Sequence, residues 1–395
     1  MLLKTYDDKN NKDIIVSFGC LFGGVLIISA MPFYGYVLAG CGAYLLARRI
    51  LKMDRFTALF KQLGLHAEDM YPELKEVRRT DYSVIRRYSL PPGLGLQDFE
   101  EKHNRMEDFI GKKIDIKCHA KNIILEIFNN AGMEHFNFEY REHDGLKVEL
   151  GRKRNGRPVI SDMLAEPHLL IGGQTGGGKT NGLKCTIVQY ILKDNALLDL
   201  IDLKGGADFH AFESSDRVTG FGRTKAEAVK IIASFLAEIH RRYQLFYDSR
   251  VKDIVVYYEK ISKKLPYRLL IIDEYASLIK DKTCVDMLFE ILNMGRAAGC
   301  FTIIATQHPS REVIPGVLKE NFCQTIAYRT KNATFSDIIL AEPGAEKLTG
   351  KGHGLFLCGD ITEFQAPFIT DDMIEALIGH TEKEPKQKVL YGGFR

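Results

Sequence analysis

The sequence predicts an α/β fold: a mainly parallel sheet with helices on both faces, preceded by an N-terminal two-helix membrane anchor and a small α+β module. Three observations support this prediction. From residue 151 onward, short apolar runs alternate with amphipathic segments, which is the pattern of strand–helix–strand units. A glycine-rich loop at 173–180 lies between one such run and the following amphipathic segment. Residues 14–47 contain no charged side chain.

The composition indicates a folded chain long enough for two domains. The 395 residues are 45% hydrophobic and 27% charged, with a formal net charge of +3. A nearly balanced charge neither requires nor excludes a nucleic-acid partner. The eight cysteines include no C-x-x-C pair, which argues against a zinc knuckle and against a disulfide framework.

The charge-free N-terminal segment predicts two membrane spans. It is longer than the roughly 20 residues that one membrane helix needs, and Pro32 and Gly35 interrupt it. We therefore expect spans at 14–31 and 33–51, joined by a tight turn. Basic residues follow at 48, 49, 52 and 55 and mark the cytoplasmic side. A signal peptide fits poorly because the segment is too long for one; a buried core hairpin is the other alternative.

The predicted organisation has four parts. Residues 1–51 form the anchor, 52–150 a juxtamembrane connector and small α/β module, 151–378 the main domain, and 379–395 a polar tail. Residues 52–90 alternate charges with isolated apolar positions, and we expect a helical connector there. Its arginines either touch anionic lipid or DNA, or form a solvated face. In the module we expect a helix at 96–110 and strands at 114–118 and 123–128.

The main domain contains candidates for most elements of a parallel sheet. The expected strands are 169–172, 197–203, 269–272, 301–305 and 325–328, and the expected helices are 180–193, 225–247 and 284–298. In the second helix, apolar residues recur at three-to-four spacing from Val229 to Phe246, which predicts one buried stripe.

The strongest local signal is a phosphate-binding loop. It satisfies the Walker A pattern G-x-x-x-x-G-K-[ST] with Gly173, Gln174, Thr175, Gly176, Gly177, Gly178, Lys179 and Thr180. The glycines let backbone N–H groups point at phosphate oxygens, and the following helix adds its dipole. Lys179 is expected to contact the β- and γ-phosphates of ATP, and the Thr180 hydroxyl is expected to bind Mg²⁺. A chance match is the alternative, but the flanking strand and helix argue against it.

A pair of carboxylates follows a later apolar run, at Asp273 and Glu274. A carboxylate at the end of a buried strand adjacent to the phosphate loop can hold Mg²⁺. A second carboxylate beside it can act as a general base on the attacking water. An apolar run that ends in Asp-Glu is common, so this pair argues for ATP hydrolysis only together with the phosphate loop.

Further polar residues end neighbouring strands. Gln307 follows the run 301–305 and is placed to sense the γ-phosphate, although a loop-capping glutamine explains the position as well. Asp202 and Lys204 end the run 197–203, either facing the same crevice or forming a strand-terminal ion pair.

Six segments in this order and spacing resemble the FtsK/SpoIIIE-type DNA translocases, over roughly 150–370. They are His168–Thr180, Arg241–Phe246, Ile272–Tyr275, Arg296–Gly299, Ala305–Ser310 and Pro343–Leu348. The resemblance implies a RecA-like ATPase core that assembles with itself into a hexameric ring around DNA. It also implies ATP sites between subunits, completed by an arginine of the neighbour, for which Arg296 and Arg329 are the candidates. His308 and Asp337 stand where the family commonly has arginine, which puts one inter-subunit contact in doubt.

The resemblance extends to a subgroup of the family. A two-span anchor, a small module and a motor domain without a sequence-reading C-terminal module look like the coupling proteins of Gram-positive conjugative elements. Such proteins hand DNA and its attached relaxase to transfer-channel proteins at the cell membrane. The alternatives are a duplex-DNA segregation translocase of the cell-division type, a protein-export ATPase, and a non-catalytic membrane scaffold. The intact Lys179, Thr180, Asp273 and Glu274 argue against the scaffold.

Overall fold

The computed structural model describes residues 55–68, 70–129, 133, 135–261 and 265–379. The chain divides into two compact units that meet in the sequence at Asn129 and Asn130. The expected membrane spans and the tail from residue 380 onward lie outside the described residues. Within the described part, none of the helices combines the length and apolar character that crossing a membrane requires. The anchor, and with it the four-part organisation of the chain, stays a prediction.

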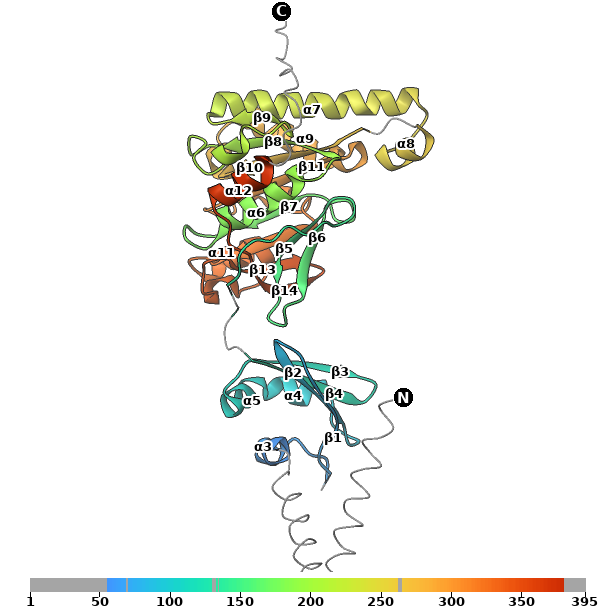
Figure 1. Cartoon of the computed structure of the whole chain (residues 1–395), viewed down its shortest axis with the longest axis vertical. Coiled ribbons are helices and arrows are strands. Elements are labelled where there is room, and N and C mark those ends of the chain that lie inside the picture. Colours follow the sequence, from blue (N-terminus) through green and yellow to red (C-terminus); the bar gives the residue numbers. More distant parts are fainter. Residues whose placement is uncertain (1–54, 69, 130–132, 134, 262–264, 380–395) are drawn as a thin grey trace, which may run out of the picture. The chain divides into compact units, whose positions relative to one another are not determined.

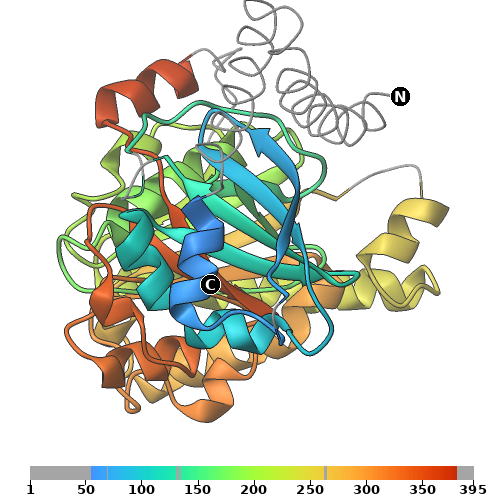
Figure 2. The same cartoon turned by 90° about the horizontal axis from the view of Figure 1, so that it is seen from below.

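The small unit contains an antiparallel sheet in the order β1-β2-β4-β3, drawn in blue to cyan in Figures 1 and 2. Its described elements are α3 (Arg55–Leu63), β1 (Glu73–Arg79), β2 (Ser83–Ser89), α4 (Leu96–Glu101), α5 (His103–Ile110), β3 (Ile114–His119) and β4 (Asn122–Phe128). Phe60 of α3, Phe99 of α4 and Met106 of α5 share one core with Tyr88 and Leu125 of the sheet. The three helices therefore pack against one face of this sheet.

The structure corrects the prediction of a helical connector over 52–90. α3 is helical, but residues 73–89 form the β1–β2 hairpin. Nearly every residue of the edge strand β1 is exposed, so the apolar alternation that marks a half-buried strand is missing from the sequence. The helix expected at 96–110 is two helices, α4 and α5, that meet at Lys102. The strands expected at 114–118 and 123–128 are present as β3 and β4.

The large unit is built on a sheet of ten strands within the described residues, in the order β6-β5-β14-β13-β12-β7-β11-β10-β8-β9. The parallel strands are β7 (Leu169–Gly172), β8 (Ala196–Asp202), β9 (Val218–Gly222), β10 (Tyr267–Asp273), β11 (Cys300–Thr306) and β12 (Gln324–Tyr328). The antiparallel extension consists of β5 (Lys147–Arg152), β6 (Pro158–Asp162), β13 (His353–Cys358) and β14 (Asp360–Gln365). The large sheet is thus mostly parallel along its central strands, as predicted.

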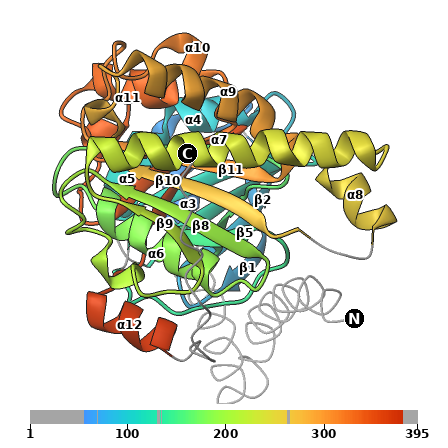
Figure 3. The same ribbon diagram turned by 90° about the horizontal axis from the view of Figure 1, so that it is seen from above.

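Helices cover both faces of this sheet, as Figure 3 shows. α7 (Lys225–Asp248) and α9 (Lys282–Ala298) pack on one face, and α6 (Lys179–Ile191) and α12 (Asp371–Gly379) on the other. The shorter elements are α8 (Ile254–Lys260), α10 (Gly316–Lys319), α11 (Ala333–Leu340) and the 3-10 turns η1 (His210–Phe212), η2 (Tyr275–Ser277) and η3 (Ala345–Lys347). Strand residues alternate between the two cores, so the central strands are buried on both faces. Strands buried in this way appear in the sequence as continuous apolar runs.

The five strands expected between 151 and 378 correspond to β7, β8, β10, β11 and β12, and the three expected helices correspond to α6, α7 and α9. α7 has the predicted buried stripe, which includes Ile232 and Ile239. It begins with a capping box, in which Thr224 and Glu227 each accept a backbone N–H of the other. Residues 147–150 differ from the expectation. The sequence assigned them to the small module, but as part of β5 they pair with β6 in the large sheet.

Candidate functional site

The phosphate loop connects β7 to α6, as its sequence predicts. Gly178 has a φ of 107°, a backbone conformation that side-chain-bearing residues rarely adopt. A Cβ at this position would also collide with the backbone of Gly352. Two other segments support the loop from outside: Gln174 donates its N–H to the Arg329 carbonyl at 2.8 Å, and Gly352 donates its N–H to the Gly177 carbonyl at 3.0 Å. The loop is therefore fixed by backbone hydrogen bonds to the segments after β12 and before β13.

The Lys179 ammonium group forms an ion pair with the Oδ1 atom of Asp273. Lys204 donates to the other oxygen, Oδ2, at 3.0 Å, and to Asp208 at 2.8 Å. The Asp273 side chain is fully buried, and burial by itself raises the pKa of a carboxyl group. The two ammonium groups outweigh that effect and hold the pKa of Asp273 below its ordinary value. Asp273 is therefore ionised at neutral pH, as a ligand of a divalent cation must be.

The carboxylates around Asp273 fit a magnesium ion by their chemistry. Asp202, Asp208 and Asp273 each offer an oxygen, and these oxygens lie within 4.8 Å of one another. Carboxylate and hydroxyl oxygens are the protein ligands that Mg²⁺ prefers, and Thr180 follows Lys179 at the start of α6. Asp202 also organises the turn after β8, because it accepts the N–H groups of Lys204 at 3.0 Å and Asp208 at 2.8 Å.

Glu274 lies directly after β10 in a left-handed backbone conformation, with a φ of 62°. Its Oε1 accepts a hydrogen bond from the Thr306 hydroxyl at 3.3 Å, and its Oε2 accepts the N–H of Gln307 at 3.2 Å. The Gln307 side chain continues the chain of contacts, since its Oε1 accepts the Thr175 hydroxyl at 2.7 Å. Hydrogen bonds thus link the phosphate loop, the end of β11 and the Glu274 carboxylate.

The sheet topology explains why these residues meet. β7, β8, β10, β11 and β12 are parallel, so their carboxyl ends lie along one edge, where open α/β sheets bind ligands. β10 lies one strand away from the phosphate-loop strand β7, because β11 lies between them, and Asp273 at its end still reaches Lys179 of the loop. Thr306 and Gln307, at the end of β11, therefore stand between the phosphate loop and Glu274.

The two candidate arginines lie at opposite ends of the parallel strands. Arg329 follows β12 beside the phosphate loop, and its side chain is exposed. Arg296 lies in the last turn of α9 and precedes the first residue of β11. Since β11 has seven residues, its two ends are about 20 Å apart. Arg296 is therefore remote from the nucleotide site of its own subunit. Asp337 is exposed on α11.

Several residues of the site were not predicted from the sequence. Asp208 contacts Asp202, and Thr306 contacts Glu274, only once the chain is folded. No local sequence pattern marks either residue. The segment Gly350–Gly352 supports the phosphate loop, and its alternating glycines, with φ of 85° and 90°, were a signal for a special backbone conformation. Lys204 was predicted with two alternatives, and the structure combines them: it ion-pairs at a strand end and faces the phosphate-loop crevice.

Comparison with known proteins identifies the domain that carries this site. Residues 137–311 match the model of the FtsK/SpoIIIE family. The chain carries an FtsK/SpoIIIE domain, and this domain is a P-loop ATPase domain. The DNA translocase FtsK of Oceanobacillus iheyensis is 33% identical over 260 residues, and that of Mycobacterium leprae is 31% identical over 261 residues. These matches cover 61% and 60% of this chain but only 33% and 31% of the relatives, so the chain spans about a third of their length.

Solved structures share the fold. The pCW3 conjugation coupling protein TcpA, solved as a monomer with ATPγS, superposes with a TM-score of 0.59 at 24% identity, over 82% of this chain and 97% of that one. The cytoplasmic domain of the type VII secretion ATPase EccC of Thermomonospora curvata gives a TM-score of 0.56 at 21% identity, over 66% of this chain and 34% of that one. At these identities the similarity establishes the fold of the FtsK/SpoIIIE domain.

Proposed function

We propose that this protein is an ATP-hydrolysing DNA translocase at the membrane, which couples DNA and its relaxase to a conjugative transfer channel. The observation that carries the proposal is the convergence of Lys179, Asp273, Glu274 and Gln307 at one edge of the parallel sheet. This arrangement places a phosphate-binding loop, a buried ionised carboxylate and a second carboxylate within reach of one nucleotide. A site with all three can hydrolyse ATP rather than only bind it.

Each residue has a role in this proposal. The backbone N–H groups of residues 173–180 hold the phosphates of ATP, and Lys179 contacts the β- and γ-phosphates. Asp273 and Thr180 hold Mg²⁺, which supplies positive charge next to the phosphates when it is bound. Glu274 orients the attacking water and accepts its proton. Gln307 senses the γ-phosphate, because it bonds both to Thr175 of the phosphate loop and, through its N–H, to Glu274.

DNA is favoured as the substrate by the curated relatives. Those that match the ATPase domain at 31–33% identity are named DNA translocases, whereas the fold is shared by a conjugation coupling protein and a secretion ATPase. Fold similarity therefore leaves three activities to compare: conjugative DNA transfer, duplex-DNA segregation and protein export. Coupling in conjugation is our first choice because the coupling protein TcpA matches 82% of this chain and is itself covered over 97% of its length.

A ring of six subunits with a RecA-like core is part of the proposal. In such a ring, ATP binds between subunits, and a neighbouring subunit supplies an arginine to the γ-phosphate. Arg296 suits this role by its position: its side chain is exposed and lies at the edge of the sheet remote from its own phosphate loop. The proposed membrane anchor at residues 1–51 would hold the ring at the cytoplasmic side of the cell membrane.

ATP turnover by the purified chain, measured without DNA and with duplex or single-stranded DNA, tests the proposal. We expect stimulation by at least one form of DNA. Glu274→Gln keeps the size and hydrogen-bonding oxygen of the side chain but cannot accept a proton. It should lower turnover by about 100-fold or more while ATP still binds, and Lys179→Ala should weaken ATP binding itself. The exposed Glu342→Gln is the matched control. Turnover that is indifferent to both forms of DNA would redirect the assignment to protein export.

A further inference from the structure

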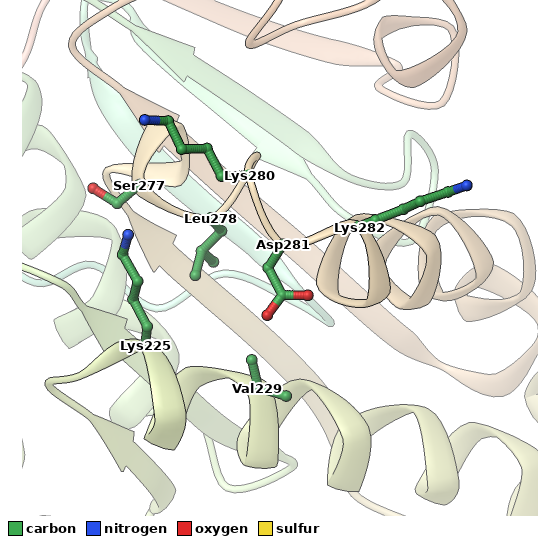
Figure 4. A pocket seen from close by; sticks show the side chains of 7 residues that line it. All are labelled: Lys225, Val229, Ser277, Leu278, Lys280, Asp281 and Lys282. Atoms are coloured by element: carbon green, nitrogen blue, oxygen red, sulfur yellow. The ribbon is translucent and has the colours of Figure 1, made fainter.

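A second basic site lies a few residues beyond Glu274 along the chain. A hollow of about 370 Å³ opens between the N-terminal ends of α7 and α9 and the turn η2, and Figure 4 shows the side chains that line it. Lys225 comes from the first residue of α7, and Ser277, Lys280 and Lys282 come from the segment that joins β10 to α9. The hollow thus shares one continuous segment, 274–282, with the proposed catalytic carboxylate.

Two of its lysines point to the same side. In Figure 4 the ammonium groups of Lys225 and Lys280 lie on either side of Ser277, whereas that of Lys282 points away from the hollow. No described acidic side chain lies within ion-pair distance of Lys225, Lys280 or Lys282, although many lysines of the chain have such partners. The Ser277 hydroxyl likewise has no hydrogen-bond partner among the described residues. Two ammonium groups and one hydroxyl are therefore available to a ligand on this side.

The acidic groups beside the hollow are already engaged. Asp281 caps α9 by accepting the Cys284 N–H at 3.1 Å. Glu227 accepts the N–H groups of Arg223 and Thr224, both at 2.9 Å, at the start of α7. Neither carboxylate is placed to neutralise Lys225 or Lys280. Both carboxylates keep their negative charge while they accept these N–H groups, but three lysines and one acidic residue, Asp281, line the hollow, so an excess of positive charge remains there.

Helix electrostatics make this arrangement unfavourable without an anion. The N-terminal end of a helix carries a partial positive charge, so acidic residues stabilise it and basic residues destabilise it. Here Lys225 is the first residue of α7, and Lys280 lies just ahead of the Asp281 cap of α9. Two lysines at the positive ends of two neighbouring helices repel both the helix dipoles and each other. An anion between them would remove that repulsion and bond to the free N–H groups of the first helical turn.

We propose that this hollow binds a phosphate group of the DNA backbone through Lys225, Lys280 and Ser277. The inference rests on the proposed function and identifies a part of the chain that touches the DNA. A motor that moves along any sequence needs contacts to phosphates rather than to bases, and two lysines with a hydroxyl provide such a contact. Because η2 connects the hollow directly to Glu274, a phosphate bound there contacts the segment that positions the proposed catalytic base. Binding of DNA at this point therefore stimulates ATP turnover.

The test is the double variant Lys225→Gln/Lys280→Gln of the purified chain, compared with Lys230→Gln/Lys282→Gln. The control removes the same charge from α7 and from the rim of the hollow, but its lysines do not flank Ser277. We measure DNA affinity at several salt concentrations, ATP turnover with and without DNA, and thermal stability. Lys225→Gln/Lys280→Gln should weaken DNA binding about tenfold and reduce the dependence of log K on log salt by about one unit. Its turnover without DNA should be unchanged, and its melting temperature without DNA should rise slightly because the helix ends are relieved of positive charge.

Several outcomes would overturn the inference. One is equal DNA affinity and equal DNA stimulation in the two double variants while the unmodified chain is stimulated, which leaves the proposed function intact. A change in self-association with unchanged DNA binding would assign the hollow to an acidic surface of a second copy instead. If the unmodified chain neither binds DNA nor responds to it, the proposed function itself fails, and the phosphate assignment fails with it. Lys225→Arg/Lys280→Arg, which keeps the charge, should retain DNA binding and thus separates loss of charge from misfolding.

Discussion

Replacing Arg242 with alanine tests how the large unit holds its helices against the sheet. Arg242 is 1% exposed. Its guanidinium group donates to Glu238 at 2.8 Å, to the Ala298 carbonyl at the end of α9 at 2.9 Å, and to the Pro266 carbonyl ahead of β10 at 2.7 Å. A single side chain therefore connects α7, α9 and the start of β10.

The expected loss of stability follows from the groups that the substitution leaves without a hydrogen-bond partner. Arg242→Ala removes three charge-assisted hydrogen bonds and leaves two backbone carbonyls without this donor. Loss of one partner of a buried ion pair costs about 3–5 kcal/mol. For a unit of this size, each kcal/mol lowers the melting temperature by about 2–4 °C. We therefore expect the melting temperature of the large unit to fall by about 6–20 °C.

Thermal and urea unfolding, followed by circular dichroism, provide the measurement. The neighbouring Arg241 is the matched control, because it bonds to the same Glu238 but its side chain is 56% exposed. Exposed ion pairs contribute about 1 kcal/mol or less, so Arg241→Ala should lower the melting temperature by only a few degrees. A loss below 2 °C for Arg242→Ala, or equal losses for both variants, would refute the argument from burial.

Two further predictions concern stability near the site. Gly182→Ala would place a Cβ against the hydroxyl of the buried Tyr328 ring. This overpacking should lower the free energy of unfolding by about 1–3 kcal/mol. Gly316→Ala, whose Cβ meets no atom within 4 Å, should be nearly neutral in the same unfolding assay. Burial lowers the pKa of His168 to about 4, below its ordinary value near 6.5. The unfolded chain therefore binds more protons between these two values, and the free energy of unfolding should fall by up to about 3 kcal/mol as the pH drops from 6.5 to 4. His168→Asn keeps an acceptor for the Thr302 N–H and should lack this decrease; an identical pH profile would contradict the assignment.

The parts of the fold that could be predicted are those that local sequence determines. The phosphate loop needs glycines at fixed spacing, and strands buried on both faces need unbroken apolar runs, so β7, α6 and β10 are visible in the sequence. The exposed edge strand β1 leaves no comparable pattern. The site divides in the same way. Glu274 and Lys179 belong to recognisable motifs, whereas Thr306 contacts Glu274 only because β11 inserts between β7 and β10.

The left-handed backbone at Glu274 limits which residues this position can accept. A residue with a Cβ pays about 1–2 kcal/mol to adopt that conformation, and aspartate and asparagine tolerate it better than glutamate does. Aspartate would relax the turn and keep the charge, but its side chain is one methylene shorter. It would hold its carboxylate back from Thr306 and Gln307, the groups that fix Glu274 at the end of β11. The backbone preference and the reach of the side chain therefore favour different residues here, so Glu274→Asp should ease the turn, lose the contacts to Thr306 and Gln307, and make the enzyme slower.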